Sequence, residues 1–163
     1  GKAPPQFQEI LKNIDPKIKT GLKENFDEEA QKEFLKGARI AYETIITDFS
    51  DNDNKLTRSK PLLSNKIQDQ FNVALKERSE RGHYAEITFI GINSADIKEH
   101  NKNNSILKVT VNFVAEVITS IKDKDKKIVS GDPEKIKKIY DTWVFSRDTS
   151  TNNPNWQLVD TLT

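Results

Sequence analysis

The sequence predicts an α+β fold in which N-terminal helices pack on a bent, four-stranded antiparallel sheet. Apolar residues recur at steps of three and four along the first 80 residues, which is typical of amphipathic helices. From residue 85 onward they alternate with polar residues, as in strands, and short polar turns separate the alternating runs. Helices followed by consecutive strands indicate an α+β fold. A long helix across such a sheet gives a cone with one open end.

The first segment, residues 4–26, is predicted to be helical and amphipathic. Asp15-Pro16 is expected to divide it into two helices or to kink it, because proline disfavours helix at the preceding residue. The segment carries an apolar stripe at helical spacing, with lysines on the polar side. The stripe consists of Phe7, Ile10, Leu11, Ile14, Ile18, Leu22 and Phe26, and the lysines are Lys12, Lys17, Lys19 and Lys23.

Two interpretations of this segment stay open. In the first, the stripe lies in the interface of an anionic membrane and the lysines face its head groups, where each basic residue adds about 1 kcal/mol. In the second, the stripe packs against its own domain. We therefore divide the chain into an amphipathic segment, residues 1–26, and a core domain, residues 27–163.

Residues 27–49 are predicted to form the longest helix. Asp27 is the expected N-cap, because aspartate at this position accepts a hydrogen bond from a free backbone N–H. Glu28 and Glu29 follow in the first turn, where the helix dipole favours acidic side chains. The polar run over residues 50–54 is expected to end the helix in a loop.

Two shorter helical elements are predicted next. Residues 56–63 form a helical turn that contains Pro61. Ser64 is then expected to cap a second helix, and Gly82 is a natural position for its C-terminal stop, since glycine adopts the left-handed conformation without strain.

The first two strands are predicted over residues 85–98 and 106–121. The second has the clearest alternation of apolar and polar residues in the chain. Gly91 indicates a bulge or bend in the first strand, because glycine inside a strand pattern often marks one. Residues 100–104 are expected to form the turn between the two strands.

The second half of the sheet begins with a charged hairpin tip at residues 122–127. The ladder is expected to resume at residues 128–129, and Gly131-Asp132-Pro133 interrupts it. A long strand over residues 135–147 and a last strand over residues 156–162 complete the predicted four-stranded sheet.

Several motifs resemble those of the Tim44-like domain family. Together they span roughly residues 26–161 and occur in order. They are Phe34-Leu35-Lys36-Gly37-Ala38-Arg39 followed by Ala41-Tyr42, then Ser59-Lys60-Pro61-Leu62-Leu63-Ser64, then Val111-Asn112-Phe113-Val114-Ala115-Glu116, then Gly131-Asp132-Pro133 with Asp141-Thr142-Trp143-Val144-Phe145-Ser146-Arg147-Asp148, and finally Asn153-Pro154-Asn155-Trp156-Gln157-Leu158-Val159. The resemblance implies a fold similar to nuclear transport factor two, with a helix-covered, strongly bent sheet around an apolar pocket.

The resemblance also implies a function at a membrane. Mitochondrial members tether the import chaperone motor to the inner-membrane protein channel and bind anionic lipid, and the helices before the core are implicated. The upstream region that engages the chaperone and the channel is not part of this sequence. The richness in Lys, Asn and Ile favours a bacterial member. We therefore expect a peripheral domain of the bacterial inner membrane, or one anchored by an upstream segment, with an unidentified protein partner.

A pocket at the mouth of the cone is the second candidate site. Such a pocket could take an acyl chain, a small apolar ligand or a peptide segment. The residues expected to line it are Tyr42, Ile46, Val111, Phe113, Trp143 and Phe145. Alternating aromatic side chains usually pack inward, so the alternative is that these six fill the core.

Composition and motifs limit the other function classes. The 26 basic and 25 acidic side chains nearly cancel, which argues against a nucleic-acid partner. Without cysteine, and with His83 and His100 as the only histidines, we expect no metal site and no cofactor. Isomerases on this fold use pocket carboxylates and a tyrosine, and Asp141 with Tyr42 would supply such groups. No catalytic motif surrounds them, so we predict a protein that is not an enzyme.

Overall fold

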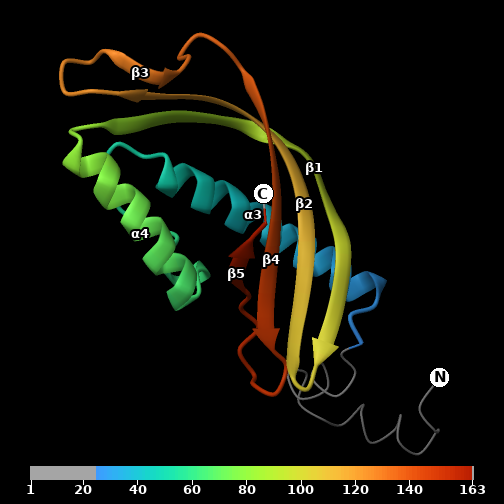
Figure 1. Ribbon diagram of the computed structural model, residues 1–163. Helices are drawn as coiled ribbons and strands as arrows, with labels where there is room; N and C mark the ends of the chain where they lie inside the picture. The colour runs from blue at the N-terminus through green and yellow to red at the C-terminus, as the bar shows by residue number, and fades with distance from the viewer. Residues whose placement is uncertain (1–24, 163) are drawn as a thin grey trace, which may run out of the picture.

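The computed structural model describes residues 25–162, in which a bent antiparallel sheet arches over two long helices (Figure 1). The elements are α3 (Glu28–Phe49), the 3-10 helix η1 (Lys60–Leu62), α4 (Asn65–Glu80), β1 (Tyr84–Asn103), β2 (Ile106–Lys122), β3 (Ile128–Gly131), β4 (Lys137–Asp148) and β5 (Gln157–Thr161). The predicted α+β fold is confirmed. Among the described helices, none has the length and apolar character needed to cross a bilayer.

Both predicted helix caps are present. The Asp27 side chain accepts a hydrogen bond of 2.9 Å from the backbone N–H of Ala30, and α3 begins at the next residue. Ser64 Oγ accepts from the N–H of Ile67 at 3.3 Å and starts α4 in the same way. Gly82, with a φ of 72°, follows the end of α4 as expected.

The sheet has five strands, one more than predicted. Its order is β1-β2-β4-β5, and β3 pairs with β2 beyond the end of β4. Residues 128–131 form a strand of their own because the chain leaves the ladder after Gly131 and rejoins it at Lys137. The expected interruption at residues 131–133 is therefore real, but it separates two strands.

The expected turn at residues 100–104 is wrong. β1 continues to Asn103, which pairs with Ile106, and the turn contains only Asn104 and Ser105. Asn104 has a φ of 57°, a left-handed conformation that asparagine adopts more readily than most residues. The side chains at this end of β1 are polar and exposed, but strand pairing uses backbone groups and does not require apolar side chains.

β1 contains the irregularities that accompany the bend of the sheet. Its register against β2 shifts three times, between Phe89 and Gly91, between Ile92 and Ser94, and between Ile97 and Glu99. Each bulge inserts an extra residue and increases the local twist. The bulge predicted at Gly91 is confirmed.

The core lies between α3 and the helix-facing side of the sheet. Alternate residues of β2 from Val109 to Val117 are at most 1% exposed. Tyr42 of α3 stacks on Phe113 of β2, with ring centroids 4.2 Å apart and an interplanar angle of 19°. Trp143 of β4 contacts the same tyrosine at 4.7 Å. Fully burying one such large side chain contributes roughly 1.5–3 kcal/mol.

Asp48 joins the end of α3 to the loop that follows. Its carboxylate is buried and accepts hydrogen bonds from two backbone N–H groups, that of Arg58 at 2.8 Å and that of Ser59 at 2.6 Å. The loop is thereby positioned for η1, which contributes to the candidate site.

We expect Asp48→Ala to lower the free energy of unfolding by about 2–4 kcal/mol, because the part-buried N–H of Arg58 and the buried N–H of Ser59 both lose their acceptor. Urea denaturation measures the change. Glu43→Ala, at an exposed position of the same helix, is the control and should change stability by less than about 0.5 kcal/mol. Equal effects of the two substitutions would show that the Asp48 hydrogen bonds do not hold this loop.

Candidate functional site

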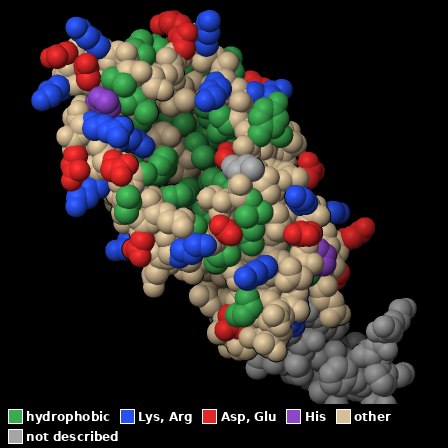
Figure 2. All heavy atoms as spheres, in the orientation of Figure 1, with side chains coloured by type: hydrophobic (Ala, Val, Ile, Leu, Met, Phe, Trp, Pro, Cys, Tyr) green, Lys and Arg blue, Asp and Glu red, His purple; other side chains and the backbone are tan. Residues whose placement is uncertain are grey.

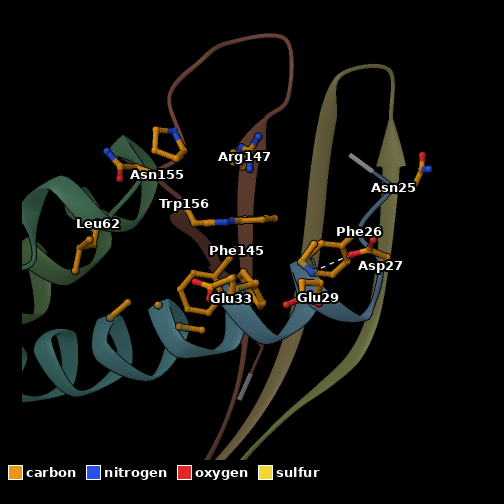
Figure 3. Close-up of a pocket in the computed structure, with 16 residues that line it drawn as sticks. Asn25, Phe26, Asp27, Glu29, Glu33, Leu62, Phe145, Arg147, Asn155 and Trp156 are labelled. Atoms are coloured by element: carbon orange, nitrogen blue, oxygen red, sulfur yellow. Dashed lines mark hydrogen bonds between the residues drawn. The ribbon is translucent and has the colours of Figure 1, made fainter. Parts of the chain in front are cut away.

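A cavity of about 690 Å³ lies between the first half of α3 and the segment that joins β4 to β5 (Figure 3). Leu62 of η1 and Phe145 of β4 contribute to its wall, and Trp156 lines it from the β4–β5 connection. The lining is mainly apolar, and the size is that of a small-molecule or lipid site.

Small residues on one face of α3 explain why this space is open. Ala30, Gly37, Ala38 and Ala41 all line the cavity and recur at helical spacing. A Cβ atom placed on Gly37 would meet no heavy atom within 4 Å. Larger apolar side chains at these positions would fill the volume, as Tyr42 and its neighbours do farther along the helix.

Four aromatic rings surround one end of the cavity. Phe34 is central, with its ring centroid 4.6 Å from Trp156, 5.7 Å from Phe26 and 5.8 Å from Phe145. The contacts with Phe26, Trp156 and Phe145 are edge-to-face, a favourable geometry for aromatic pairs. The rings therefore form a stable apolar wall.

Phe26 is held in a left-handed backbone conformation at the cavity. Its φ is 48°, which is uncommon for a residue with a side chain and costs of the order of 1–3 kcal/mol. Gln31 Nε2 donates a hydrogen bond of 2.9 Å to the backbone carbonyl oxygen of Phe26. The centroid of the Phe26 ring lies 5.0 Å from that of the His100 ring. These contacts hold Phe26, only 5% exposed, at the point where the chain enters the described domain.

Charged side chains lie at the rim of the cavity. Figure 3 shows Arg147 and Trp156 on one side and Glu29 and Glu33 on the α3 side. The guanidinium carbon of Arg147 lies 6.0 Å from the centroid of the Trp156 ring, a cation–π distance. The site thus combines an apolar interior with a polar rim, which suits an amphipathic ligand.

The structure places most of the predicted pocket residues elsewhere. Phe145 lines the cavity. Tyr42, Val111, Phe113 and Trp143 are buried in the core, and Ile46 is half-buried against it. Sequence reasoning missed the wall formed by Phe26, Phe34, Leu62, Arg147 and Trp156 and by the small residues of α3. The run of small residues at helical spacing was the signal that could have found it.

Most of the predicted membrane-contact residues lie outside the described part of the chain. These are Phe7, Ile10, Leu11, Lys12, Ile14, Lys17, Ile18, Lys19, Leu22 and Lys23. Phe26 is the exception, and its ring belongs to the aromatic wall of the cavity.

Tyr42 and Asp141 form a hydrogen-bonded pair between α3 and β4. The tyrosine hydroxyl donates to Asp141 Oδ2 at 2.5 Å. Burial raises the pKa of Asp141 above its ordinary value, and the hydrogen bond from Tyr42 partly offsets this effect. Burial also raises the pKa of the Tyr42 hydroxyl, and its interaction with Asp141 adds to the shift. Neither residue lines the cavity, so the pair links helix to sheet.

The two histidines make contacts within the fold and do not belong to a metal site in the described residues. His100 falls in the turn predicted over residues 100–104, but it lies in β1 and its ring contacts Phe26. The backbone carbonyl of His83 accepts from Asn54 Nδ2 at 3.2 Å. Within residues 25–162, no group of three or more His, Asp or Glu side chains is arranged to hold a metal ion.

Comparisons with known proteins identify a family and solved structures of similar shape. The family model described as "Tim44-like domain" matches residues 19–163. Among solved structures, the intermembrane space region of the chloroplast protein ARC6 matches at 11% identity and a TM-score of 0.48, over 77% of this chain and 92% of that one. A search of curated proteins found no match.

The raised pKa of Asp141 predicts a pH-dependent stability. The folded state binds this proton more tightly than the unfolded state, so the Asp141 contribution to the free energy of unfolding falls as pH rises from about 3.8 through the raised pKa. Asp141→Asn should remove this fall, whereas Asp96→Asn, at an exposed position, should leave it unchanged. Urea unfolding across this pH range tests the prediction. An unaltered pH profile in Asp141→Asn would contradict it.

Proposed function

Because this chain belongs to the Tim44-like domain family, we propose that it is a membrane-peripheral tethering domain that contacts anionic lipid and holds a protein partner. Domains of this family are in general membrane-associated tethers, and the family is not known as enzymatic. We further propose that the membrane is a bacterial inner membrane. The composition rich in Lys, Asn and Ile supports that source.

The observation that carries the lipid role is the position of the cavity at the junction with the amphipathic segment. Asn25 and Phe26 both line the cavity, and they are the last two residues of the predicted amphipathic segment. An apolar stripe with lysines and an apolar cavity therefore adjoin each other in the chain. This combination suits a membrane surface better than a freely diffusing ligand.

In this proposal an acyl chain of a lipid enters the cavity from the membrane side. The four aromatic rings and the alanines of α3 would contact the chain. Arg147 lies at the rim, where a guanidinium can hydrogen-bond a phosphate. The cavity volume of about 690 Å³ lies within the ordinary range for ligand sites.

A second candidate function rests on the same cavity. The domain would bind a small apolar ligand away from any membrane, and the amphipathic segment would pack on protein. The two candidates differ in whether binding needs a bilayer, and vesicle experiments separate them.

We expect Leu11→Asp with Ile14→Asp to abolish flotation of the chain with cardiolipin-containing vesicles, because both charges enter the apolar stripe. The matched control is Gln6→Asp with Asn13→Asp, which adds the same charge on the polar side of the predicted helix.

Flotation of the wild type, the stripe variant (Leu11→Asp with Ile14→Asp) and the control variant is measured by density-gradient centrifugation. The control should float less than the wild type but far more than the stripe variant. Equal flotation of stripe variant and wild type would remove the lipid role of this segment.

For the cavity, we expect Gly37→Phe to reduce the amount of copurified lipid at least roughly tenfold, since the added ring occupies open space without a backbone clash. Ile40→Phe, at an exposed position one turn away that does not line the cavity, should leave the lipid content unchanged. Mass spectrometry of the purified proteins measures it. If both variants retained the wild-type lipid content, the cavity would not be the lipid site.

A further inference from the structure

The corner of the sheet around β3 differs in charge from the rest of the domain. We call residues 122–140, from the end of β2 through β3 to the start of β4, the β3 corner. It contains seven lysines and four acidic residues, an excess of three positive charges, whereas the other residues of 25–162 include 14 basic and 18 acidic side chains. Basic charge is therefore concentrated at this corner of an otherwise acidic domain.

The same corner also contains exposed apolar side chains. Ile128, Val129, Ile136 and Tyr140 are 49–66% exposed, and they are four of the eight large hydrophobic side chains that are exposed in the described chain. Figure 1 draws β3 at the opposite end of the sheet from the β4–β5 connection, so the corner is distinct from the cavity. In Figure 2, hydrophobic, basic and acidic side chains are intermixed at this end of the molecule.

The strand register places part of this set on one face. Ile128 lies opposite Lys122, and Tyr140 lies opposite Val114. Lys122 and Val114 are both even-numbered positions of β2, so they share a face. The odd-numbered positions of β2 from Leu107 to Val117 are buried, and Phe113 among them stacks on Tyr42 of α3. Ile128 and Tyr140 therefore point away from the helices, on the outer face of the sheet.

Part of the acidic charge in the corner is engaged in turns. Asp123 Oδ1 accepts from the backbone N–H groups of Asp125 at 2.9 Å and Lys127 at 3.0 Å. Asp132 Oδ1 accepts from the N–H of Glu134 at 2.9 Å. These two carboxylates hold the backbone of the corner and are less available to pair with the lysines.

Most lysines of the corner are available to a partner. Lys122 pairs with Glu86 at 2.9 Å. The six others form no ion pair within the described part of the chain, and all six are exposed. They are Lys124, Lys126, Lys127, Lys135, Lys137 and Lys138.

The backbone of the β3 corner is held in place at Gly131. Gly131 has a φ of 78°, and a Cβ atom there would lie 2.4 Å from the carbonyl oxygen of Thr119. The N–H of Asp132 donates to the same oxygen at 3.2 Å. Only glycine allows so close an approach, and it fixes β3 and the following connection against β2.

We propose that the β3 corner is a second membrane-contact surface, which inserts Ile128, Ile136 and Tyr140 into the interface of an anionic bilayer. The lysines lie against lipid phosphates. This inference rests on the proposed membrane-surface function and adds a contact site to it. Apolar and aromatic side chains surrounded by lysines match an anionic bilayer, which offers both negative charge and an apolar interior. Tyrosine also favours the head-group region.

The absence of cysteine makes a direct test possible, because one introduced cysteine carries the only label. Ile136→Cys, Leu11→Cys and Val73→Cys are each labelled with an environment-sensitive fluorophore in the full chain. Val73 is 59% exposed on α4 and serves as the control. Each protein is mixed with vesicles of phosphatidylglycerol and phosphatidylcholine, and with phosphatidylcholine alone.

We expect a blue shift and a rise in emission at position 136 with the anionic vesicles only, and no change at position 73. If the emission changed at position 11 but not at position 136, the β3 corner would not be a membrane-contact surface, and the proposed function would still stand. Unchanged emission at positions 11 and 136 would contradict both the β3-corner proposal and the proposed membrane function. A response at position 136 alone would support the corner and remove the amphipathic segment from the membrane contact.

Charge neutralisation gives an independent measurement. Lys135→Gln, Lys137→Gln and Lys138→Gln together should weaken vesicle binding roughly a hundredfold, given the attraction of each lysine to an anionic surface. Lys98→Gln, Lys102→Gln and Lys108→Gln, three exposed strand positions at the other end of the sheet, remove the same charge. If the two triple variants lost affinity equally, only net charge would matter and the corner would not be a specific surface.

Discussion

The packing of α3 against the bent sheet is the contact on which the rest of the structure depends. At its centre, Tyr42 stacks on Phe113 and donates a hydrogen bond to Asp141, so that one side chain joins the helix to both β2 and β4. The register shifts in β1 accompany the curvature that brings the sheet around the helix. Asp48 then fixes the chain that leaves α3 and positions η1 beside the site.

One helix face accounts for both the core and the cavity. Beyond residue 41, α3 presents Tyr42 and Ile45, which fill the space beneath the sheet. Before residue 42, the same face carries mainly alanine and glycine, and the space remains open. Phe34 provides the aromatic wall of that open half. The change from small to large side chains along one helix therefore separates a ligand site from a packed core, and it leaves the site next to the amphipathic segment.

Local signals in the sequence predicted most of the elements, whereas long-range contacts determined what was missed. Asp27 and Ser64 mark their helices because a cap depends only on neighbours in the chain. The end of β1 was missed because the backbone pairing of residues 100–103 overrides their polar side chains. Phe26 was assigned to the amphipathic stripe by its spacing, but contacts with His100 and Trp156, far along the chain, determine its position. The cavity could not be located without knowing which loop faces α3.

The central claim is that this domain binds an anionic membrane surface through apolar and basic side chains together. Equilibrium binding of the unmodified chain to vesicles that differ only in their content of anionic lipid tests it most directly, with the salt concentration as the second variable. The account predicts binding that rises with anionic lipid and weakens as salt screens the lysines. Binding that is absent, or equal on neutral and anionic vesicles at every salt concentration, would contradict it.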